Sequence, residues 1–250
     1  MEAASKAVDD LLKDLKSFIV TNPPEEKQHQ CEKCKDTGFI QIEENGQTKV
    51  MYCHDCEKKR NLERWLAHSG ISQNDYDRYK MSTFLTDTEE AARMAERARK
   101  FLKDKNAKGI GFFGRSGTGK THICIAVCQA MEKEHHYWQY RHQIQRIKAV
   151  MYKDLGQYEE LLKIPKTSPC LYIDDLFKGA WANGGISNQD LQIMFDIIDA
   201  RYINGLQTIV SSEYDLEKIT GADEAIGSRL YEILSPHIMY VSGINRRINC

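Results

Sequence analysis

Residues 114–121 read Gly-Arg-Ser-Gly-Thr-Gly-Lys-Thr, which matches the pattern G-x-x-x-x-G-K-[ST] of a phosphate-binding loop. Glycines in such a loop allow backbone N–H groups to curl around a β-phosphate. The ammonium of Lys120 would reach the β- and γ-phosphate oxygens, and the Thr121 hydroxyl would ligate Mg²⁺. An apolar run precedes the loop and a helix-forming run follows it, which is the order that such a site requires. The nucleotide-binding residues that we expect are Gly114, Arg115, Ser116, Gly117, Thr118, Gly119, Lys120, Thr121 and His122.

A second apolar run, Cys170-Leu-Tyr-Ile, ends in the paired carboxylates of Asp174 and Asp175. Downstream of a phosphate-binding loop, this pair predicts that Asp174 holds Mg²⁺ through water and that Asp175 polarises the attacking water as general base. Most proteins of this kind have Glu in the second position. Because Asp is one methylene shorter, we expect slow hydrolysis or a different water position. The alternative is that the pair caps a helix or closes a turn at the end of the strand.

The eight cysteines divide into a cluster and a scatter. Cys31-Glu-Lys-Cys34 and Cys53-His-Asp-Cys56 are two C-x-x-C pairs separated by 18 residues, a spacing typical of structural zinc sites. The segment between them has the pattern of a short β-hairpin, and four thiolates complete a zinc tetrahedron without His54. Disulfides are disfavoured in a reducing compartment, and a redox pair would ordinarily lie in a βαβ unit. The other four are expected to be free thiols: Cys124, Cys128, Cys170 and Cys250.

Strand-like and helix-like segments alternate through the second half of the chain. Strands are expected at residues 109–113, 137–141, 170–174, 207–212 and 237–241, with helices at 122–133, 142–154, 187–202 and 223–234. Strands that are joined by helical crossovers form a parallel sheet, so we expect a three-layer α/β fold. The sequence contains no Asn-Lys-x-Asp motif for reading guanine, which favours adenine as the base.

A length of 250 residues with 41% hydrophobic and 28% charged positions fits a globular protein with a large core and an appendage. We expect an amphipathic helix and a zinc-binding module in residues 1–60, a linker in 61–86 and an ATPase domain in 87–250. The apolar spacing between Val8 and Ile19 predicts the helix, which either packs on the zinc module or binds a partner groove.

The net charge is −1, from 35 basic and 36 acidic side chains, so any nucleic-acid contact must come from a local patch. Residues 135–153 interleave aromatic and basic side chains, a combination suited to stacking bases and holding phosphates. Alternating strand residues also form sheet cores, which is the competing interpretation. No apolar stretch approaches membrane length and the first 20 residues are not a secretory signal, so we expect a cytoplasmic location without a membrane partner. The patch comprises Tyr137, Trp138, Tyr140, Arg141, Arg146 and Lys148.

Several segments together resemble the DnaC and DnaI family of replicative helicase loaders, in a phage or prophage version. The resemblance runs through nearly the whole chain from residue 31 and rests on the phosphate-binding loop and residues 31–38, 171–178, 208–213 and 223–229. It implies an AAA+ ATPase that uses ATP and binds the replicative hexameric helicase through its N-terminal region. The protein would help to place that helicase on single-stranded DNA, and its AAA+ domain would assemble with other copies.

The resemblance also implies roles for individual polar residues. Ser212 and Glu213 fall where the family has its sensor-one residue, commonly Asn, so either could sense the γ-phosphate. Arg229 matches the arginine finger offered to ATP on an adjacent subunit, with Arg201 as a second candidate and a surface ion pair as the alternative role. Arg247 matches the sensor-two arginine. Only 37 residues follow Glu213, too few for a helical lid, so Arg247 would act from the sheet edge or belong to a charged tail.

Three other functions share some of these motifs. A transposition helper of the IstB type has the same AAA+ core but usually lacks the cysteine pairs. A zinc-dependent DNA-binding regulator could use the loop only to sense nucleotide. A small-molecule kinase with a phosphate-binding loop would phosphorylate its substrate as a monomer.

Overall fold

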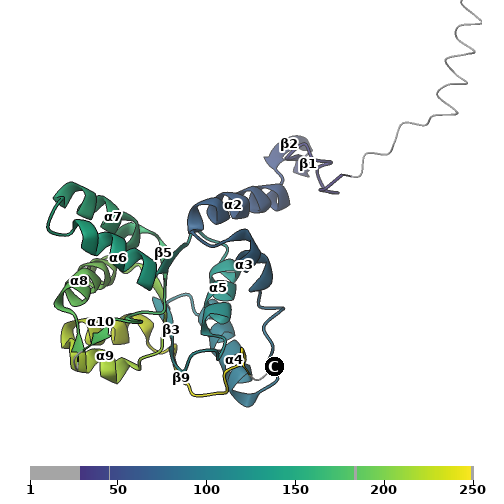
Figure 1. Cartoon of the computed structure of the whole chain (residues 1–250). Helices are drawn as coiled ribbons and strands as arrows, with labels where there is room; N and C mark the ends of the chain where they lie inside the picture. The colour runs from purple at the N-terminus through teal and green to yellow at the C-terminus, as the bar shows by residue number, and fades with distance from the viewer. Residues whose placement is uncertain (1–28, 45, 183–184, 249–250) are drawn as a thin grey trace, which may run out of the picture. The chain divides into compact units, whose positions relative to one another are not determined.

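The computed structural model describes residues 29–44, 46–182 and 185–248 (Figure 1). The chain divides into two compact units, Met1–Lys59 and Arg60–Cys250. The boundary falls within one helix, α2 (His54–Ser69). The amphipathic helix predicted between Val8 and Ile19 lies outside the described residues, as does Cys250.

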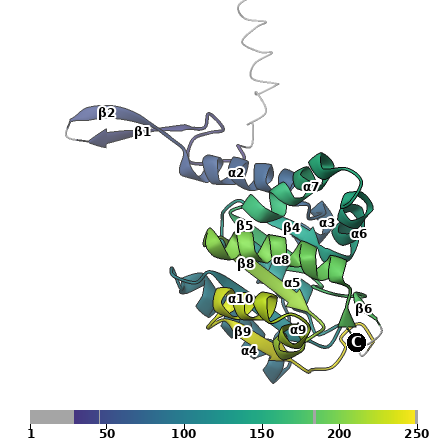
Figure 2. The ribbon, with the colours of Figure 1, turned by 90° about the vertical axis from the view of Figure 1, so that its left-hand side faces the viewer.

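The first unit contains an antiparallel hairpin of β1 (Phe39–Glu44) and β2 (Gln47–Tyr52) (Figure 2). Its register pairs Phe39 with Tyr52, and their ring centroids lie 5.1 Å apart. The hairpin predicted between the two C-x-x-C pairs is therefore confirmed. Because the strands run in opposite directions, the start of β1 and the end of β2 lie side by side, which brings the two cysteine pairs together.

The second unit is built on a parallel sheet with the strand order β4-β5-β8-β3-β9. These strands are β3 (Gly109–Gly114), β4 (His136–Gln139), β5 (Cys170–Asp174), β8 (Gln207–Ser212) and β9 (Ile238–Val241). β8 lies between β3, which leads into the phosphate-binding loop, and β5, which leads into the paired carboxylates. The carboxyl ends of parallel strands share one edge of a sheet, so the loop and the carboxylates meet there.

Helices cover both faces of this sheet, so the predicted three-layer α/β fold is confirmed (Figure 1). One layer contains α3 (Gln73–Arg78), α4 (Glu89–Lys103) and α5 (Lys120–Ala130). The other contains α6 (Tyr140–Val150), α7 (Leu155–Thr167), α8 (Asn188–Ile203), α9 (Leu216–Ala222) and α10 (Glu224–Leu234). Successive strand residues enter opposite layers: Phe112 packs with the first and Phe113 with the second.

The segment expected as a linker, residues 61–86, differs from that prediction. It contains the end of α2 and the short helix α3, and it buries Ile71, Tyr76 and Phe84 in the core beneath α4 and α5. Gln129 on α5 donates hydrogen bonds to the backbone oxygens of Tyr76 and Tyr79, at 2.7 and 3.0 Å. The apolar residues of this segment follow neither a helical nor a strand period, which is why the sequence alone indicated an irregular connector.

The remaining elements are short. A hairpin of β6 (Trp181–Ala182) and β7 (Gly185–Ile186) follows β5. After β9, residues 242–245 have no regular secondary structure and residues 246–248 form a turn. Among the helices in the described part of the chain, none is long and apolar enough to cross a membrane.

Candidate nucleotide-binding site and cysteine cluster

The phosphate-binding loop occupies the turn between β3 and α5. Gly117 has a φ of 77° and Gly119, directly before α5, has a φ of 98°. Both values lie in the left-handed region that favours glycine, and a Cβ on Gly117 would also collide with the Asn245 side chain. The loop therefore needs glycine here and opens at the N-terminus of α5, where free N–H groups and the helix dipole favour an anion.

Lys120 is the first residue of α5, and only 5% of it is exposed. Its Nζ donates hydrogen bonds of 2.6 Å to the backbone oxygens of Gly114 and Arg115. Burial lowers the pKa of this ammonium, and the carboxylates of Asp175 and Glu213 oppose that shift. Charged phosphate oxygens are stronger acceptors than peptide carbonyls. A phosphate in the loop would therefore compete successfully for Lys120.

Asp174, at the end of β5, accepts hydrogen bonds from four hydroxyl groups. Thr121 Oγ1, Tyr172 OH and Ser211 Oγ donate to its Oδ1, at 3.1, 2.5 and 2.6 Å. Tyr137 OH donates to its Oδ2 at 2.8 Å. Burial and the charge of Asp174 raise the pKa of both phenols, so they remain protonated donors. The carboxylate is thus fixed beside Thr121, as a shared magnesium site requires.

Asp175 adopts a left-handed backbone conformation, with a φ of 55°. Its N–H donates to Ser211 Oγ at 3.1 Å, and its Oδ2 lies 2.9 Å from Lys178 Nζ. Lys178 also pairs with Glu213 Oε1 at 2.8 Å. Burial lowers the pKa of Lys178, but its hydrogen bonds to Glu213 and Asp175 outweigh burial and raise it. One ammonium therefore joins two carboxylates beside the loop.

The two expected sensor-one residues point in different directions. Ser212 is fully buried, and its hydroxyl donates to the Leu176 backbone oxygen at 2.9 Å, away from the loop. Burial raises the pKa of the Glu213 carboxyl, but hydrogen bonds to Lys178 and Ser116 outweigh burial and hold that pKa below its usual range. Ser211, which sequence reasoning missed, is the β8 residue that contacts Asp174. Alternation along β8 could have identified it, because Ser211 and Ser212 face opposite sides of the sheet.

A cavity of about 790 Å³ opens over the loop. Its phosphate-binding end contains Ser116, Lys120 and Thr121, with Asp175 and Lys178 beside them. The remaining lining residues are Arg78, Tyr79, Thr83, Phe84, Leu85, Gly117, Gly119, His122, Arg246 and Arg247. The structure thus gathers most of the predicted nucleotide-binding residues around one cavity.

Aromatic side chains also line the cavity beside the loop. The ring of His122 lies 5.0 Å from that of Tyr79 and 5.1 Å from that of Phe84. Burial lowers the pKa of His122, while a hydrogen bond to the Lys80 backbone oxygen opposes the shift. Tyr79 and Phe84 belong to the segment expected as a linker, so sequence reasoning missed them. Their proximity to the loop depends on how that segment packs, which no local motif records.

The C-terminal segment returns to the loop. The Arg246 N–H donates to the Gly117 backbone oxygen at 2.9 Å, and its guanidinium pairs with Asp87 at 2.6 Å. Arg247 is exposed and lines the cavity. The segment therefore carries Arg247 from the edge strand β9 to the cavity wall, where a sensor-two arginine would be needed.

Arg229 on α10 does not line the cavity of its own chain. Its Nε pairs with Asp199 on α8 at 2.8 Å, and Nη1 donates to the Ala225 backbone oxygen at 3.0 Å. The guanidinium also lies over the rings of Phe195 and Tyr202, 5.1 and 5.7 Å from their centroids. It remains partly exposed, with 28% of its side chain accessible.

Arg201, the second finger candidate, is excluded by burial. It has no exposed surface, and its guanidinium donates to Thr208 Oγ1 and to the backbone oxygens of Pro165, Ser168 and Gln207. Burial lowers its pKa to about 10. This arginine joins α7, α8 and β8 within the core.

The aromatic residues proposed to stack on DNA are mostly structural. Trp138 is 2% exposed and Tyr140 is 1% exposed, while the partly buried Tyr137 binds Asp174. Lys148 pairs with the buried Asp190. The prediction of a stacking surface in residues 135–153 is therefore wrong, because helices cover both faces of the sheet and these rings pack into the core. Arg141 and Arg146 remain exposed.

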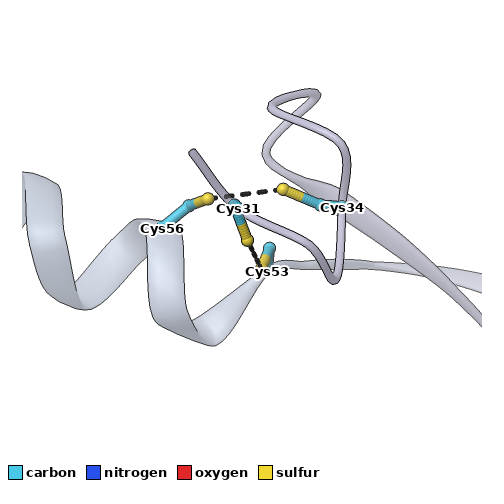
Figure 3. A group of neighbouring side chains, drawn as sticks. All are labelled: Cys31, Cys34, Cys53 and Cys56. Atoms are coloured by element: carbon cyan, nitrogen blue, oxygen red, sulfur yellow. Dashed lines mark hydrogen bonds between the residues drawn. The ribbon is translucent and has the colours of Figure 1, made fainter. Parts of the chain in front are cut away.

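The four cysteines of the first unit point toward one another in Figure 3. The sulfurs of Cys31 and Cys53 lie 3.7 Å apart, those of Cys34 and Cys56 lie 3.3 Å apart, and all four fall within 4.8 Å. Zinc–sulfur bonds of about 2.3 Å in a tetrahedron place sulfurs about 3.8 Å apart, so the donor set fits Zn²⁺. His54 is exposed and lies outside the cluster, as expected.

Three of the cysteines predicted to be free thiols are described, and all are fully buried in the second unit: Cys124, Cys128 and Cys170. Burial raises the pKa of the Cys124 thiol well above its usual range. These side chains act as small apolar groups in the core.

No family model matches the chain. The phage-like element PBSX protein XkdC of Bacillus subtilis strain 168 is 25% identical over 255 residues, covering 97% of this chain and 94% of that protein. The solved structure of the DnaC helicase loader matches with a TM-score of 0.55 and 23% identity, covering 68% of this chain and 100% of that one. The DnaI structure matches with a TM-score of 0.54 and 19% identity, covering 71% of this chain and 95% of that one. The predicted resemblance to DnaC and DnaI is confirmed as a likeness of fold.

Proposed function

We propose that this protein is an ATPase that binds the replicative hexameric DNA helicase and assists its loading on single-stranded DNA in phage or prophage replication. The observation that carries this proposal is the presence, in one chain, of a phosphate-binding cavity and a separate four-cysteine cluster. The fold likeness to a helicase loader and the similarity to a protein named for a phage-like element support it.

The cavity suits ATP. Lys120 and the loop N–H groups would hold the phosphates, and the rings of Tyr79 and Phe84 offer apolar surfaces for adenine. Thr121 and Asp174 would hold Mg²⁺, which would neutralise part of the charge on the phosphates. A volume of about 790 Å³ is within the range of small-molecule pockets.

Hydrolysis would use Asp175 as the base that orients and polarises the attacking water. In the structure this carboxylate is paired with Lys178. The second cation needed at the transition state would be Arg229 of a neighbouring copy, since Arg229 does not line its own chain's cavity. Turnover would therefore be slow in the isolated chain and faster after assembly.

The N-terminal region would contact the helicase. Its zinc, when bound, would hold the hairpin and the start of α2 together through four thiolates. Both strands of the hairpin leave large apolar side chains exposed, among them Phe39, Val50 and Tyr52. DNA contact would be weak for each subunit, because the net charge is −1 and Arg141 and Arg146 are isolated exposed cations.

A loading assay tests the proposed function. The cognate helicase is mixed with circular single-stranded DNA, with or without this protein and ATP, and the helicase that co-elutes with DNA is measured. We expect more DNA-bound helicase with the wild-type protein and ATP, but not with Lys120→Ala. An equal amount of bound helicase in all mixtures would contradict the proposal. ATP-dependent filaments on duplex DNA, without helicase binding, would instead favour an IstB-type transposition helper.

A further inference from the structure

Lys178 is a cation at the cavity that belongs to neither the phosphate-binding loop nor the arginines discussed above. It lies in the turn after β5, where its N–H also donates to the Asp175 backbone oxygen at 2.9 Å. Its side chain pairs with Asp175 at 2.9 Å and Glu213 at 2.8 Å. With 31% of that side chain accessible, the ammonium can reach a ligand in the cavity.

The position of Lys178 identifies the part of a nucleotide that it would meet. Its partner Asp175 directly follows Asp174, which accepts a hydrogen bond from Thr121. The aromatic residues Tyr79 and Phe84 also line this cavity. With a base on those rings and phosphates in the loop, the outermost phosphate would lie toward the carboxylates that hold Lys178.

The bonding of Lys178 leaves capacity for such a phosphate. An ammonium has three N–H donors, and the two carboxylates use two of them. Without Lys178, only the ammonium of Lys120 would offset the negative charges of Asp175 and Glu213 near the incoming phosphate. The raised pKa of Lys178 keeps it charged at neutral pH. The cluster of Asp175, Lys178 and Glu213 therefore provides the positively charged Lys178 where the negatively charged outermost phosphate would lie.

We propose that Lys178 binds the γ-phosphate and makes this site prefer ATP over ADP. Glu213 acts through Lys178, since a carboxylate has no proton to donate to a phosphate oxygen. When Lys178 binds the γ-phosphate, its ion pair with Asp175 weakens. The Asp175 carboxylate can then accept a hydrogen bond from the attacking water. This assignment rests on the proposed nucleotide binding.

The competing role for Lys178 is an ion pair that only braces the turn after β5. Partly exposed pairs of this kind contribute about 0–1 kcal/mol. Such a role would affect ADP and ATP alike, because the turn is common to both complexes. Comparing the two nucleotides therefore separates the roles without relying on turnover.

The experiment measures dissociation constants for Mg²⁺-ADP and for a non-hydrolysable Mg²⁺-ATP analogue. We compare the wild type, Lys178→Met and Lys178→Arg, which keeps the cation. Lys163→Met is the matched control, because Lys163 forms an i,i+3 pair with Glu160 at 3.7 Å outside the cavity.

We expect Lys178→Met to bind the ATP analogue at least about tenfold more weakly, because one charge-assisted hydrogen bond is lost. Binding of ADP should stay unchanged, Lys178→Arg should retain most of the preference for the ATP analogue, and Lys163→Met should match the wild type. If Lys178→Met binds both nucleotides more weakly by the same factor, or binds both as tightly as the wild type, the assignment to Lys178 is overturned. A wild-type protein that binds neither nucleotide would instead refute the proposed function.

Discussion

At the scale of single residues, the proposed magnesium site is organised by hydroxyl groups. Asp174 accepts from Thr121, Tyr172, Ser211 and Tyr137, and no cation is among its hydrogen-bond partners in the described structure. Its charge is therefore fixed in position without being neutralised, which suits a carboxylate that must attract a divalent ion. Asp175 differs, because its carboxylate is paired with the ammonium of Lys178.

The role of Lys120 gives the first prediction. Lys120→Ala should weaken ATP binding at least about a hundredfold, because several charge-assisted hydrogen bonds to phosphate are lost together. Titration with a fluorescent ATP analogue measures the effect. The control is Lys105→Ala, which removes an exposed lysine that precedes β3 and does not line the cavity. If Lys120→Ala binds the ATP analogue as tightly as the wild type, the loop does not bind the phosphates as proposed.

Site residues could be predicted from the sequence where they belong to one contiguous motif, and could not where they come from separate segments of the chain. The phosphate-binding loop is one contiguous pattern, so Lys120 and Thr121 were predicted and the structure places both at the cavity. Lys178, Ser211 and Phe84 come from three other segments. Their convergence depends on sheet order and on the packing of residues 71–86, which no short motif encodes.

At the scale of elements, apolar strands were predictable and short or interrupted helices were not. Four of the expected strands match β3, β5, β8 and β9 within one residue, whereas β4 ends two residues before its expected end, at Gln139, because α6 begins at Tyr140. The sequence did not indicate α7, whose last turn contains Pro165, since proline predicts a helix end. It also did not indicate α9, which at seven residues is too short for a clear helical period.

Arg201 supports a stability prediction at this scale. Arg201→Ala should lower the free energy of unfolding by about 3 kcal/mol, because it leaves buried oxygens on α7 and around β8 without a donor. Urea unfolding of the wild type, Arg201→Ala and the exposed control Arg99→Ala measures this loss. If Arg201→Ala unfolds at the same urea concentration as the wild type, Arg201 does not join these elements as described.

The cysteine cluster makes a separate prediction about the first unit. The purified protein should contain about one zinc per chain, and Cys53→Ser should lose the metal because only three thiolates remain. Cys124→Ala, which removes a buried thiol of the second unit, should keep it. Elemental analysis measures the zinc content. A content near zero in carefully prepared wild-type protein, with all four thiols free to react, would refute the zinc site.

At the scale of the whole molecule, the proposed hydrolysis requires that copies of the protein assemble. Arg229 is held by Asp199 and by aromatic rings, yet it remains partly exposed. A partly exposed ion pair contributes about 0–1 kcal/mol, so a neighbouring ATP could draw Arg229 away at little cost. Self-association of the protein would then depend on bound ATP, and the rate of ATP hydrolysis would increase with assembly.

The Arg229 prediction separates a finger from an ion pair. Arg229→Ala should leave ATP affinity unchanged but lower turnover by about a thousandfold or more, or abolish ATP-dependent self-association. Asp199→Asn breaks the same pair while keeping the guanidinium, so it should retain both properties. Steady-state hydrolysis and light scattering measure them. Wild-type turnover and self-association in Arg229→Ala would show that the residue only braces α8 and α10.

The most direct test of the central claim is whether this protein binds a replicative helicase. The cognate hexameric helicase and this protein are run together on a sizing column coupled to light scattering, with and without ATP. If the protein is a helicase loader, we expect a complex of greater mass than the helicase hexamer, which is lost when Cys53→Ser disrupts the cysteine cluster. A helicase that elutes alone under every nucleotide condition, beside a folded and zinc-loaded wild-type protein, would contradict the proposal.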